Sequence, residues 1–248
     1  MAKNIGMIQF KGKIGGLVGR DTRFGNILQT PGGFESERVK NDPIYEKTRQ
    51  LNAEMAHCSR IASVLKSCLS PHLQLVSDPY VYNHIVRQLL LVKNCDTETP
   101  KGQKTFDKGL ATKEGAAAFG RLSFNRERHT HNRLLQAESA QLLQGKLHLA
   151  AVSASDFYFP PAAPLLGIQL LLLRLDTGIP CCKLSSSAVQ FIRKDSQSVS
   201  VDLQAAIPEG TGRLIAVVFT GYTNEQRNPI VWKRNNATGL SVLAFSQG

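Results

Sequence analysis

The sequence lacks any apolar run long enough for a membrane span or a signal peptide. Its most apolar stretch, residues 164–175, contains Arg174 and is followed by Asp176, and it is shorter than the roughly 20 residues that a spanning helix needs. Glycines and lysines interrupt the opening residues, MAKNIGMIQFKGK, before the apolar segment of a signal peptide could form. We therefore expect no membrane span and synthesis in the cytoplasm, with a virion or an extracellular assembly left open as the final location.

Cysteine is also scarce, and its spacing argues against two kinds of stabilised fold. The number of cysteines is odd, no two of them form a C-x-x-C pair, and adjacent cysteines rarely bridge each other. A disulfide framework and a structural zinc site are therefore not expected, and this usage favours a reducing compartment. The five cysteines are Cys58, Cys68, Cys95, Cys181 and Cys182.

The chain also lacks a recognisable reaction centre. The pattern Gly12-x-x-Gly15-Gly16-x-x-Gly19 resembles a phosphate-binding loop in its glycines, but the Gly-Lys-Ser/Thr ending is missing and no helix opens directly after it. The serines at Ser185–Ser187 stand without the Gly-x-Ser-x-Gly turn of a hydrolase. We predict that the protein is not an enzyme and takes no cofactor.

Histidines and carboxylates give no better candidate. His57 and Cys58 are adjacent, so on a helix their side chains do not face each other, and Cys58 belongs to an apolar stripe that predicts a buried, unreactive thiol. His129 and His131 have no third ligand nearby in the sequence, so we expect no metal site. Carboxylates in the second half are expected to hydrogen-bond turns rather than to act as acid and base: Asp156, Asp176, Asp195 and Asp202.

What the sequence has in excess is positive charge. Lys and Arg number 30 against 19 Asp and Glu, a formal net charge of +11. Such a field favours nucleic acid, anionic lipid or an acidic protein without choosing among them. Few aromatic residues are interleaved for base stacking, so a solvated face or an acidic neighbour is favoured over nucleic acid. The densest basic patch comprises Lys11, Lys13, Arg20, Arg23, Arg38, Lys40, Lys47 and Arg49, and a second cluster comprises Arg121, Arg126, Arg128 and Arg133.

The first 33 residues read as a β-hairpin. Apolar side chains recur at roughly alternate positions, and glycines between them mark bulges, turns or close backbone contacts. An exposed hairpin can add its strands to the sheet edge of a neighbouring subunit, so we interpret this segment as an assembly arm. Its proposed contact residues are Ile8, Phe10, Gly12, Ile14, Gly15, Gly16 and Gly19.

Two or three amphipathic helices are predicted after the arm, and two of them have a clear start. Asn41-Asp42-Pro43 is a helix start, with Asp42 as N-cap and Pro43 in the first turn. A stripe with spacings of three and four residues follows, and Pro71 ends it. Asp78-Pro79 starts a second helix with Val81, Ile85, Leu89 and Val92 on one face, and a long polar loop is expected over residues 94–115. The first stripe, the expected helix core, comprises Leu51, Met55, Cys58, Ala62, Leu65 and Leu69.

The second half reads as all-β. Apolar or alternating runs are separated by Gly, Pro, Asn and Asp, which is typical of an antiparallel sandwich. The predicted class is therefore α+β, with an arm and link over residues 1–40, a helical region over 41–140 and an immunoglobulin-like β-sandwich over 141–248. The expected strands lie within residues 146–152, 165–175, 184–192, 199–203, 214–219 and 240–245.

Three segments together resemble a family of uncharacterised Bacteroidota proteins of similar length. They are the hairpin KGKIGGLVGR with its Gly-Lys-x-Gly motif, the Asn-Asp-Pro helix start, and the closing segment VVFTGYTNEQRNPIVWKRNNATGLSVLAF. The resemblance covers most of the chain and implies a hairpin, a helical middle and a β-sandwich. It implies no reaction, because no activity is established for that family.

These observations lead to two functional hypotheses and a weaker third. The first is a non-enzymatic structural or self-assembly protein of a multi-copy object, such as a phage-like particle or a filament, held together through the arm. The second is a nucleic-acid-binding accessory protein that uses the basic patch on phosphates. The third is ligand recognition by loops around Tyr222 and Trp232.

Overall fold

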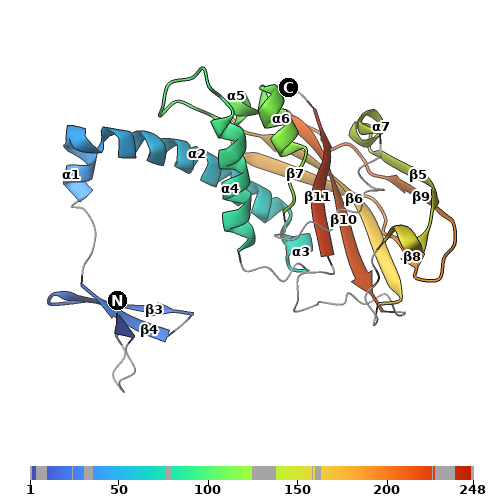
Figure 1. Ribbon diagram of the computed structural model, residues 1–248, viewed down its shortest axis with the longest axis horizontal. Helices are drawn as coiled ribbons and strands as arrows, with labels where there is room; N and C mark the ends of the chain where they lie inside the picture. Colours follow the sequence, from blue (N-terminus) through green and yellow to red (C-terminus); the bar gives the residue numbers. More distant parts are fainter. Residues whose placement is uncertain are drawn as a thin grey trace. The chain divides into compact units, whose positions relative to one another are not determined.

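The computed structural model describes the chain as two compact units, Met1–Arg49 and Gln50–Gly248 (Figure 1). The structure describes residues 2–3, 10–23, 25–30, 36–75, 80–124, 138–157, 159, 163–224, 226 and 238–246.

The N-terminal unit contains a small antiparallel sheet with the strand order β1-β4-β3-β2. Gly15 and Gly16 join β2 to β3, and the positive φ of 55° at Gly15 alone fits a type II′ hairpin turn. No atom lies within 4 Å of a Cβ built on Gly15, so the turn requires glycine for its backbone angle and not for space. The strands are β1 (Ala2–Lys3), β2 (Gly12–Ile14), β3 (Leu17–Thr22) and β4 (Gly25–Gln29).

The interior of this sheet is polar. Among the described residues of the unit only Gly19 and Asn26 are buried. A Cβ on Gly19 would lie 2.2 Å from the carbonyl oxygen of Phe10, so β3 and the Phe10 backbone meet too closely for any side chain. Asn26 donates from Nδ2 to that carbonyl at 3.1 Å and to the Asp21 carboxylate at 2.6 Å. The described part of the unit therefore has no apolar core of its own.

The helix start at Asn41-Asp42-Pro43 is confirmed. After α1 (Ser36–Asn41), the Asp42 side chain accepts from the backbone N–H of Ile44 at 3.0 Å and caps η1 (Pro43–Tyr45), which leads into α2 (Glu46–Cys68). The predicted stripe on α2 is correct in part. Cys58, Ala62, Leu65 and Leu69 are fully buried.

The first two members of that stripe are a correction. Leu51 and Met55 are 57% and 51% exposed, and Glu54 is buried in their place. The carboxylate of Glu54 is paired with Lys93 of α4 (Val81–Asn94). Because this pair lies on the buried face of α2, Leu51 and Met55 lie at the edge of that face and stay exposed. The second stripe is confirmed, because Val81, Ile85, Leu89 and Val92 of α4 are all buried.

The segment 94–115 is not one continuous loop, as the sequence had suggested. It contains α5 (Phe106–Leu110) and the start of α6 (Lys113–Phe119). Thr105 and Thr112 cap these helices by accepting from the backbone N–H groups of Lys108 and Gly115. Phe106 and Leu110, four residues apart, bury one face of α5 and hold the segment against the core.

A five-stranded antiparallel sheet forms the centre of the second unit. Its order is β11-β10-β6-β7, and β8 also pairs with β6. Leu171, Leu173 and Leu175 of β6 pack on the helices. The alternate residues Leu170 and Leu172 pack on the other side in a second core. Both faces of the sheet are thus covered, and this explains the continuous apolar sequence of β6. The strands are β6 (Leu165–Asp176), β7 (Cys181–Ser186), β8 (Gln190–Arg193), β10 (Arg213–Thr223) and β11 (Thr238–Phe245).

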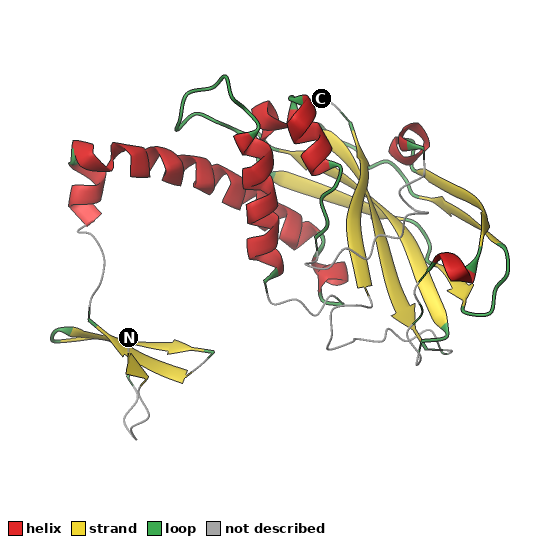
Figure 2. Ribbon diagram, viewed as in Figure 1, coloured by secondary structure: helices red, strands yellow, loops and turns green. Residues whose placement is uncertain are grey.

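A helical layer and a strand pair cover the two faces of this sheet (Figure 2). The strand pair, β5 (Lys146–Val152) with β9 (Val199–Gln204), is antiparallel and packs with α7 (Ser139–Leu143) on the second core. The helical layer consists of α2, α3 (Ser70–Leu73), α4, α5 and α6. The α+β class and the C-terminal antiparallel sheet are confirmed.

The immunoglobulin-like sandwich is not confirmed. In such a sandwich two sheets of three or more strands enclose the core, whereas here helices cover one face of the larger sheet and a sheet of two described strands packs on the other. The expected boundary near residue 140 does not separate two units either, because the helices and the C-terminal strands share one hydrophobic core. In the described parts of the chain, we find no helix with the length and apolar character needed to span a membrane.

Candidate interaction surfaces

The predicted assembly arm presents an open strand edge. Within the described residues β2 pairs only with β3, with Ile14 opposite Leu17, Lys13 opposite Val18 and Gly12 opposite Gly19. In a two-residue hairpin the pair next to the turn exchanges hydrogen bonds, and the next pair does not. The backbone N–H and C=O of Lys13 therefore point away from β3, toward the open edge.

The arm also exposes apolar side chains. Ile14 is 61% exposed and Leu17 is 44% exposed, directly beside the hairpin turn. Gly12, Gly15 and Gly16 are exposed as well, Phe10 is half-buried and Gly19 is buried. Ile8, the remaining predicted contact, lies outside the described residues.

The basic patch of the sequence is partly neutralised within its own unit. Lys11 pairs with Asp21 at 2.8 Å, and Arg38 lies 3.9 Å from Asp42. Arg49 donates to the carbonyl oxygens of Val39 and Asp42, both at 2.9 Å. The other members are exposed: Lys13, Arg20, Arg23, Lys40 and Lys47. Of the second basic cluster, Arg121 is exposed and the other three arginines lie outside the described residues.

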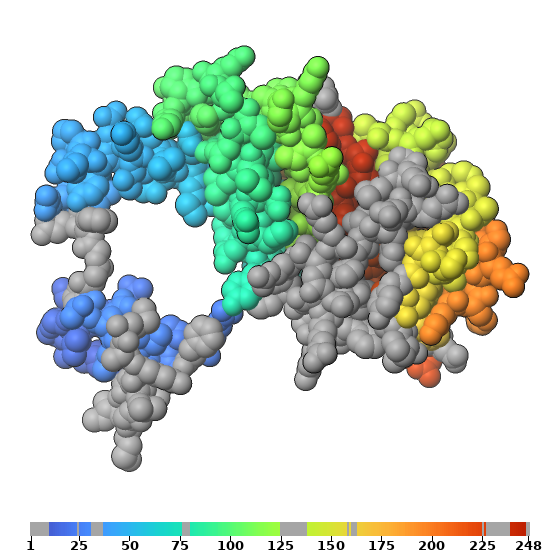
Figure 3. Space-filling model, in the orientation of Figure 1, coloured from blue at the N-terminus to red at the C-terminus, as the bar shows by residue number. Residues whose placement is uncertain are grey.

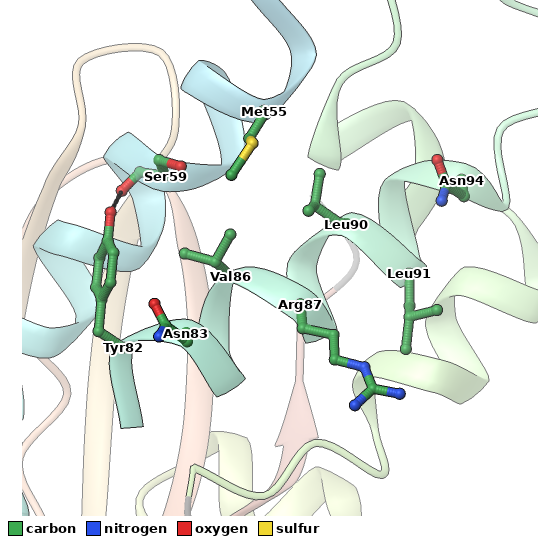
Figure 4. A pocket seen from close by; sticks show the side chains of 9 residues that line it. All are labelled: Met55, Ser59, Tyr82, Asn83, Val86, Arg87, Leu90, Leu91 and Asn94. Atoms are coloured by element: carbon green, nitrogen blue, oxygen red, sulfur yellow. Dashed lines mark hydrogen bonds between the residues drawn. The ribbon is translucent and has the colours of Figure 1, made fainter. Parts of the chain in front are cut away.

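A groove lies between α2 and α4 in the second unit. It has a volume of about 400 Å³. Figure 4 shows Met55 on α2 and Val86 and Leu90 on α4 lining this groove. Tyr82 donates from its hydroxyl to the carbonyl oxygen of Ser59 at 3.3 Å and joins the two helices at one end. The groove is lined by Met55, Ser59, Tyr82, Asn83, Val86, Arg87, Leu90, Leu91 and Asn94.

Sequence reasoning missed this groove. The sequence pattern places Met55 in a buried stripe and gives no sign that Leu91 is 48% exposed. In the space-filling view α4 lies at the surface of its unit (Figure 3). The available clue was that α4 carries apolar residues on more than one face, since Leu89, Leu90 and Leu91 are consecutive.

A buried ion pair joins the two helices that form the groove. Glu54 of α2 and Lys93 of α4 are paired, and their side chains are only 2% and 5% exposed. Glu54 also accepts from the backbone N–H of Gly102 at 2.6 Å. Burial by itself would raise the pKa of Glu54, but the hydrogen bonds from Lys93 and Gly102 outweigh it and hold the pKa below its ordinary 4.5. The pair therefore fixes α2 to α4 as charged partners.

Two cysteine sites differ in character. Cys58 is fully buried in α2, and burial raises the pKa of its thiol to about 11, which agrees with the predicted unreactive thiol. Cys68 at the end of α2 is hydrogen-bonded to Cys182 of β7. The hydrogen bond is the larger cause, and burial the second, of the raised pKa of Cys182. The same hydrogen bond lowers the pKa of Cys68.

The Cys68 and Cys182 thiols are expected to form a disulfide under mild oxidation. Diamide accepts the two thiol hydrogens as the S–S bond forms, and the hydrogen bond between the Cys68 and Cys182 thiols brings their sulfurs near each other. Peptide mass mapping should find the Cys68–Cys182 crosslink, while Cys58 stays free. Cys68→Ser should remove the crosslink; a dominant Cys181 crosslink in the wild type would contradict the assignment.

Two histidines in the helical layer are partly buried with one ring nitrogen each lacking a described partner. The unpartnered atoms are Nε2 of His57 and Nδ1 of His72. The Nε2 of His72 lies 3.1 Å from the Gln169 side-chain oxygen, and its ring packs edge-on against Phe219. Burial lowers the pKa of both histidines below 6.5; nearby Asp107 opposes this at His57.

Stability is therefore expected to fall as the pH drops below 6.5. Because the folded pKa values are depressed, the unfolded chain binds more protons below pH 6.5, and acid favours unfolding. Urea unfolding at about pH 7.5 and about pH 5.5 should show this loss, and His57→Gln with His72→Gln should reduce it. An unchanged pH dependence in the double variant would contradict the prediction.

The remaining candidate residues have structural roles. Ser187 accepts at its hydroxyl from the backbone N–H of Leu170 at 3.0 Å and donates to the Ala188 carbonyl at 2.7 Å. Asp156 and Asp176 hydrogen-bond turns, as predicted. Tyr222 is buried in the second core, and Trp232 lies outside the described residues.

An exposed pair on the β5–β9 sheet also fails to form a catalytic triad. Asp202 is not in a turn; it lies in β9 and pairs with His148 of β5. The hydrogen bond with His148 is the main cause that lowers the pKa of Asp202, and Ser200 contributes another. Both partners thus bind the carboxylate, whereas a triad needs the imidazole between the hydroxyl and the carboxylate.

No cluster of three or more His, Cys, Asp or Glu side chains suited to a metal ion occurs in the part of the chain that the structure describes. His129 and His131 lie outside that part. Comparisons with protein-family models, curated proteins and solved structures find no match to this chain. The resemblance to the Bacteroidota family stays a prediction, and the function has to be argued from the two surfaces themselves.

Proposed function

We propose that the protein is a non-enzymatic self-assembly protein that uses its N-terminal sheet for contacts between subunits. The observation that carries this proposal is the absence of a buried apolar side chain among residues 10–23 and 25–30 of that sheet. A small sheet without an apolar layer is only marginally stable by itself. Ile14 and Leu17 stand exposed at the hairpin, where a neighbouring subunit can cover them.

The open edge of β2 supplies the second part of the argument. Lys13 directs its backbone N–H and C=O outward, and a strand of an adjacent copy can satisfy both groups without a special side chain. An edge contact of this kind repeats from copy to copy. The multi-copy object, a phage-like particle or a filament, is part of the proposal.

The expected result of Lys13→Pro is loss of the multi-copy species. Proline removes the outward N–H of β2 but no hydrogen bond to β3, so the hairpin keeps its own pairing. Size-exclusion chromatography with light scattering should give the mass of one chain for the variant and a multiple for the wild type. Lys13→Thr, which keeps the N–H, is the matched control.

A second pair of variants tests the apolar contact. Ile14→Asp with Leu17→Asp should also give single chains, whereas Ile207→Asp, at a site 47% exposed in the other unit, should leave the mass unchanged. Single chains in the wild type, or assembly that survives both arm variants, would refute the proposal.

Nucleic-acid binding is the second candidate. Lys13 and Arg20 lie on the exposed sheet and have no ion-pair partner among the described residues. A mobility shift that weakens steeply with salt, and is lost in Lys13→Glu with Arg20→Glu, would favour this candidate over assembly.

A further inference from the structure

We propose that the groove between α2 and α4 binds an acidic amphipathic helix of a partner protein. This inference concerns a different unit from the assembly sheet and does not depend on it. It rests on the apolar lining of the groove, on its helical walls and on the sign of the charges around it.

The groove is bordered by large apolar side chains that water would otherwise contact. Met55 and Leu91 are 51% and 48% exposed, and Leu51, one turn before Met55 on α2, is 57% exposed. Val86 and Leu90 form the lining between them. These apolar side chains gather at one recess, with polar residues such as Asn83 and Asn94 beside them, and a partner that covers them would remove them from water.

The helical walls of the groove favour a helix over a strand as the partner. Both walls are helices, whose backbone groups are already hydrogen-bonded along each helix, so an added strand would find no backbone partners. A helix needs none, because it satisfies its own backbone and presents side chains at positions i, i+3, i+4 and i+7. Those side chains can enter the space between Met55 and Leu90.

The charges around the groove favour a partner with negative charge. From Gln50 to its end, α2 contains one carboxylate, Glu54, which is buried against Lys93, and α4 contains none. Arg87 lines the groove, and the Lys66 ammonium lies 5.7 Å from the centre of the Tyr82 ring. These exposed cations are complementary to acidic side chains flanking the apolar stripe of a partner helix.

The same charges disfavour the other occupants. A second copy that presented the same face would place Arg87 and Lys66 opposite their own equivalents. Nucleic acid would meet the cations but would leave Met55 and Leu91 uncovered. A bilayer surface is flat and would not fill the recess between the helices.

Fluorescence anisotropy with labelled peptides tests the proposal on the full chain. The probe is a peptide of Leu, Ala and Glu, about 18 residues long because shorter isolated helices are marginal. Its leucines recur at i, i+3, i+4 and i+7. One control peptide replaces every Glu by Lys, and another has the same composition with a scrambled order.

The acidic peptide should bind, and Leu91→Glu and Arg87→Glu should each weaken binding at least about tenfold. The matched variants Ile207→Glu and Arg193→Glu, at exposed positions on other elements, should bind like the wild type. Both groove positions are exposed, and circular dichroism checks that each variant is folded.

Three results would overturn the proposal. The first is equal binding of the scrambled or Lys peptide, or equal binding by the groove variants. The second is a particle mass that falls in Leu91→Glu, which would make the occupant a second copy. The third is capture by phosphatidylserine vesicles that depends on Leu91 while the peptide does not bind. Failure of the assembly proposal is read separately, from Lys13→Pro.

Discussion

Replacing Lys93 with methionine is expected to lower the free energy of unfolding by about 3–5 kcal/mol. The substitution leaves the Glu54 carboxylate buried without its cation, since the Glu54 side chain is 2% exposed. The N–H of Gly102 remains as one hydrogen-bond donor, which does not replace the lost charge. Urea unfolding followed by circular dichroism measures the change.

Two controls separate the charge from the loss of a lysine. Lys113→Met, at an exposed position of α6, should change stability by no more than about 0.5 kcal/mol. Glu54→Leu combined with Lys93→Met removes both charges and should recover most of the loss, because neither buried ion is then left alone. A double variant as unstable as Lys93→Met would show that packing and not charge is responsible.

The effect of Lys93→Met should also shrink in acid. The folded pKa of Glu54 lies below its ordinary 4.5, so the wild-type pair contributes stability above pH 4.5 and loses it as the pH falls through the folded pKa. In the variant that contribution is already absent. The difference between wild type and variant should therefore decrease below pH 4.5.

Replacing Gly109 with alanine is expected to destabilise the second unit by about 1–3 kcal/mol. A Cβ at Gly109 in α5 would lie 2.2 Å from the Val92 carbonyl oxygen and 2.8 Å from the Lys93 Cα, both in the backbone of α4. Backbone atoms cannot rotate away as a flexible side chain would. The α5 helix would have to move off α4, with partial exposure of Phe106 and Leu110.

Gly120 provides the matched control for this prediction. It follows α6 with φ of −62°, and a Cβ there would meet its nearest atom, the Ala116 carbonyl oxygen, at 3.4 Å. Gly120→Ala should therefore be neutral or stabilising by up to about 1 kcal/mol. Thermal unfolding of the two variants compares them directly, and a Gly109→Ala protein as stable as Gly120→Ala would contradict the close helix contact.

Short-range chemistry accounts for the elements that were predicted correctly. The Asp42 cap and Pro43 fix a helix start through interactions within a few residues, and they lie where the sequence placed them. The stripe of α4 and the alternation in β5 follow from the periods of the helix and the strand. The helices at 106–110 and 113–119 were missed because their polar composition outweighed the capping threonines Thr105 and Thr112.

Of the two candidate surfaces, the sequence indicated only one. The glycines at 15 and 16 allow the tight turn of the hairpin, so the sequence predicts the arm and Ile14 as an exposed contact. The groove could not, because it depends on which face of α2 meets α4. A buried pair between Glu54 and Lys93, 39 positions apart, decides that face.

The sequence by itself determined the local elements: the glycine hairpin, the capped helix and the run of β-strands, because each depends on neighbours in the chain. Tertiary structure alone decided that helices, and not a second sheet, cover one face of β6, and that Met55 and Leu91 stay exposed. Such choices depend on the free energy of packing between distant segments, where burial of one charged pair or one close glycine contact outweighs a local apolar pattern.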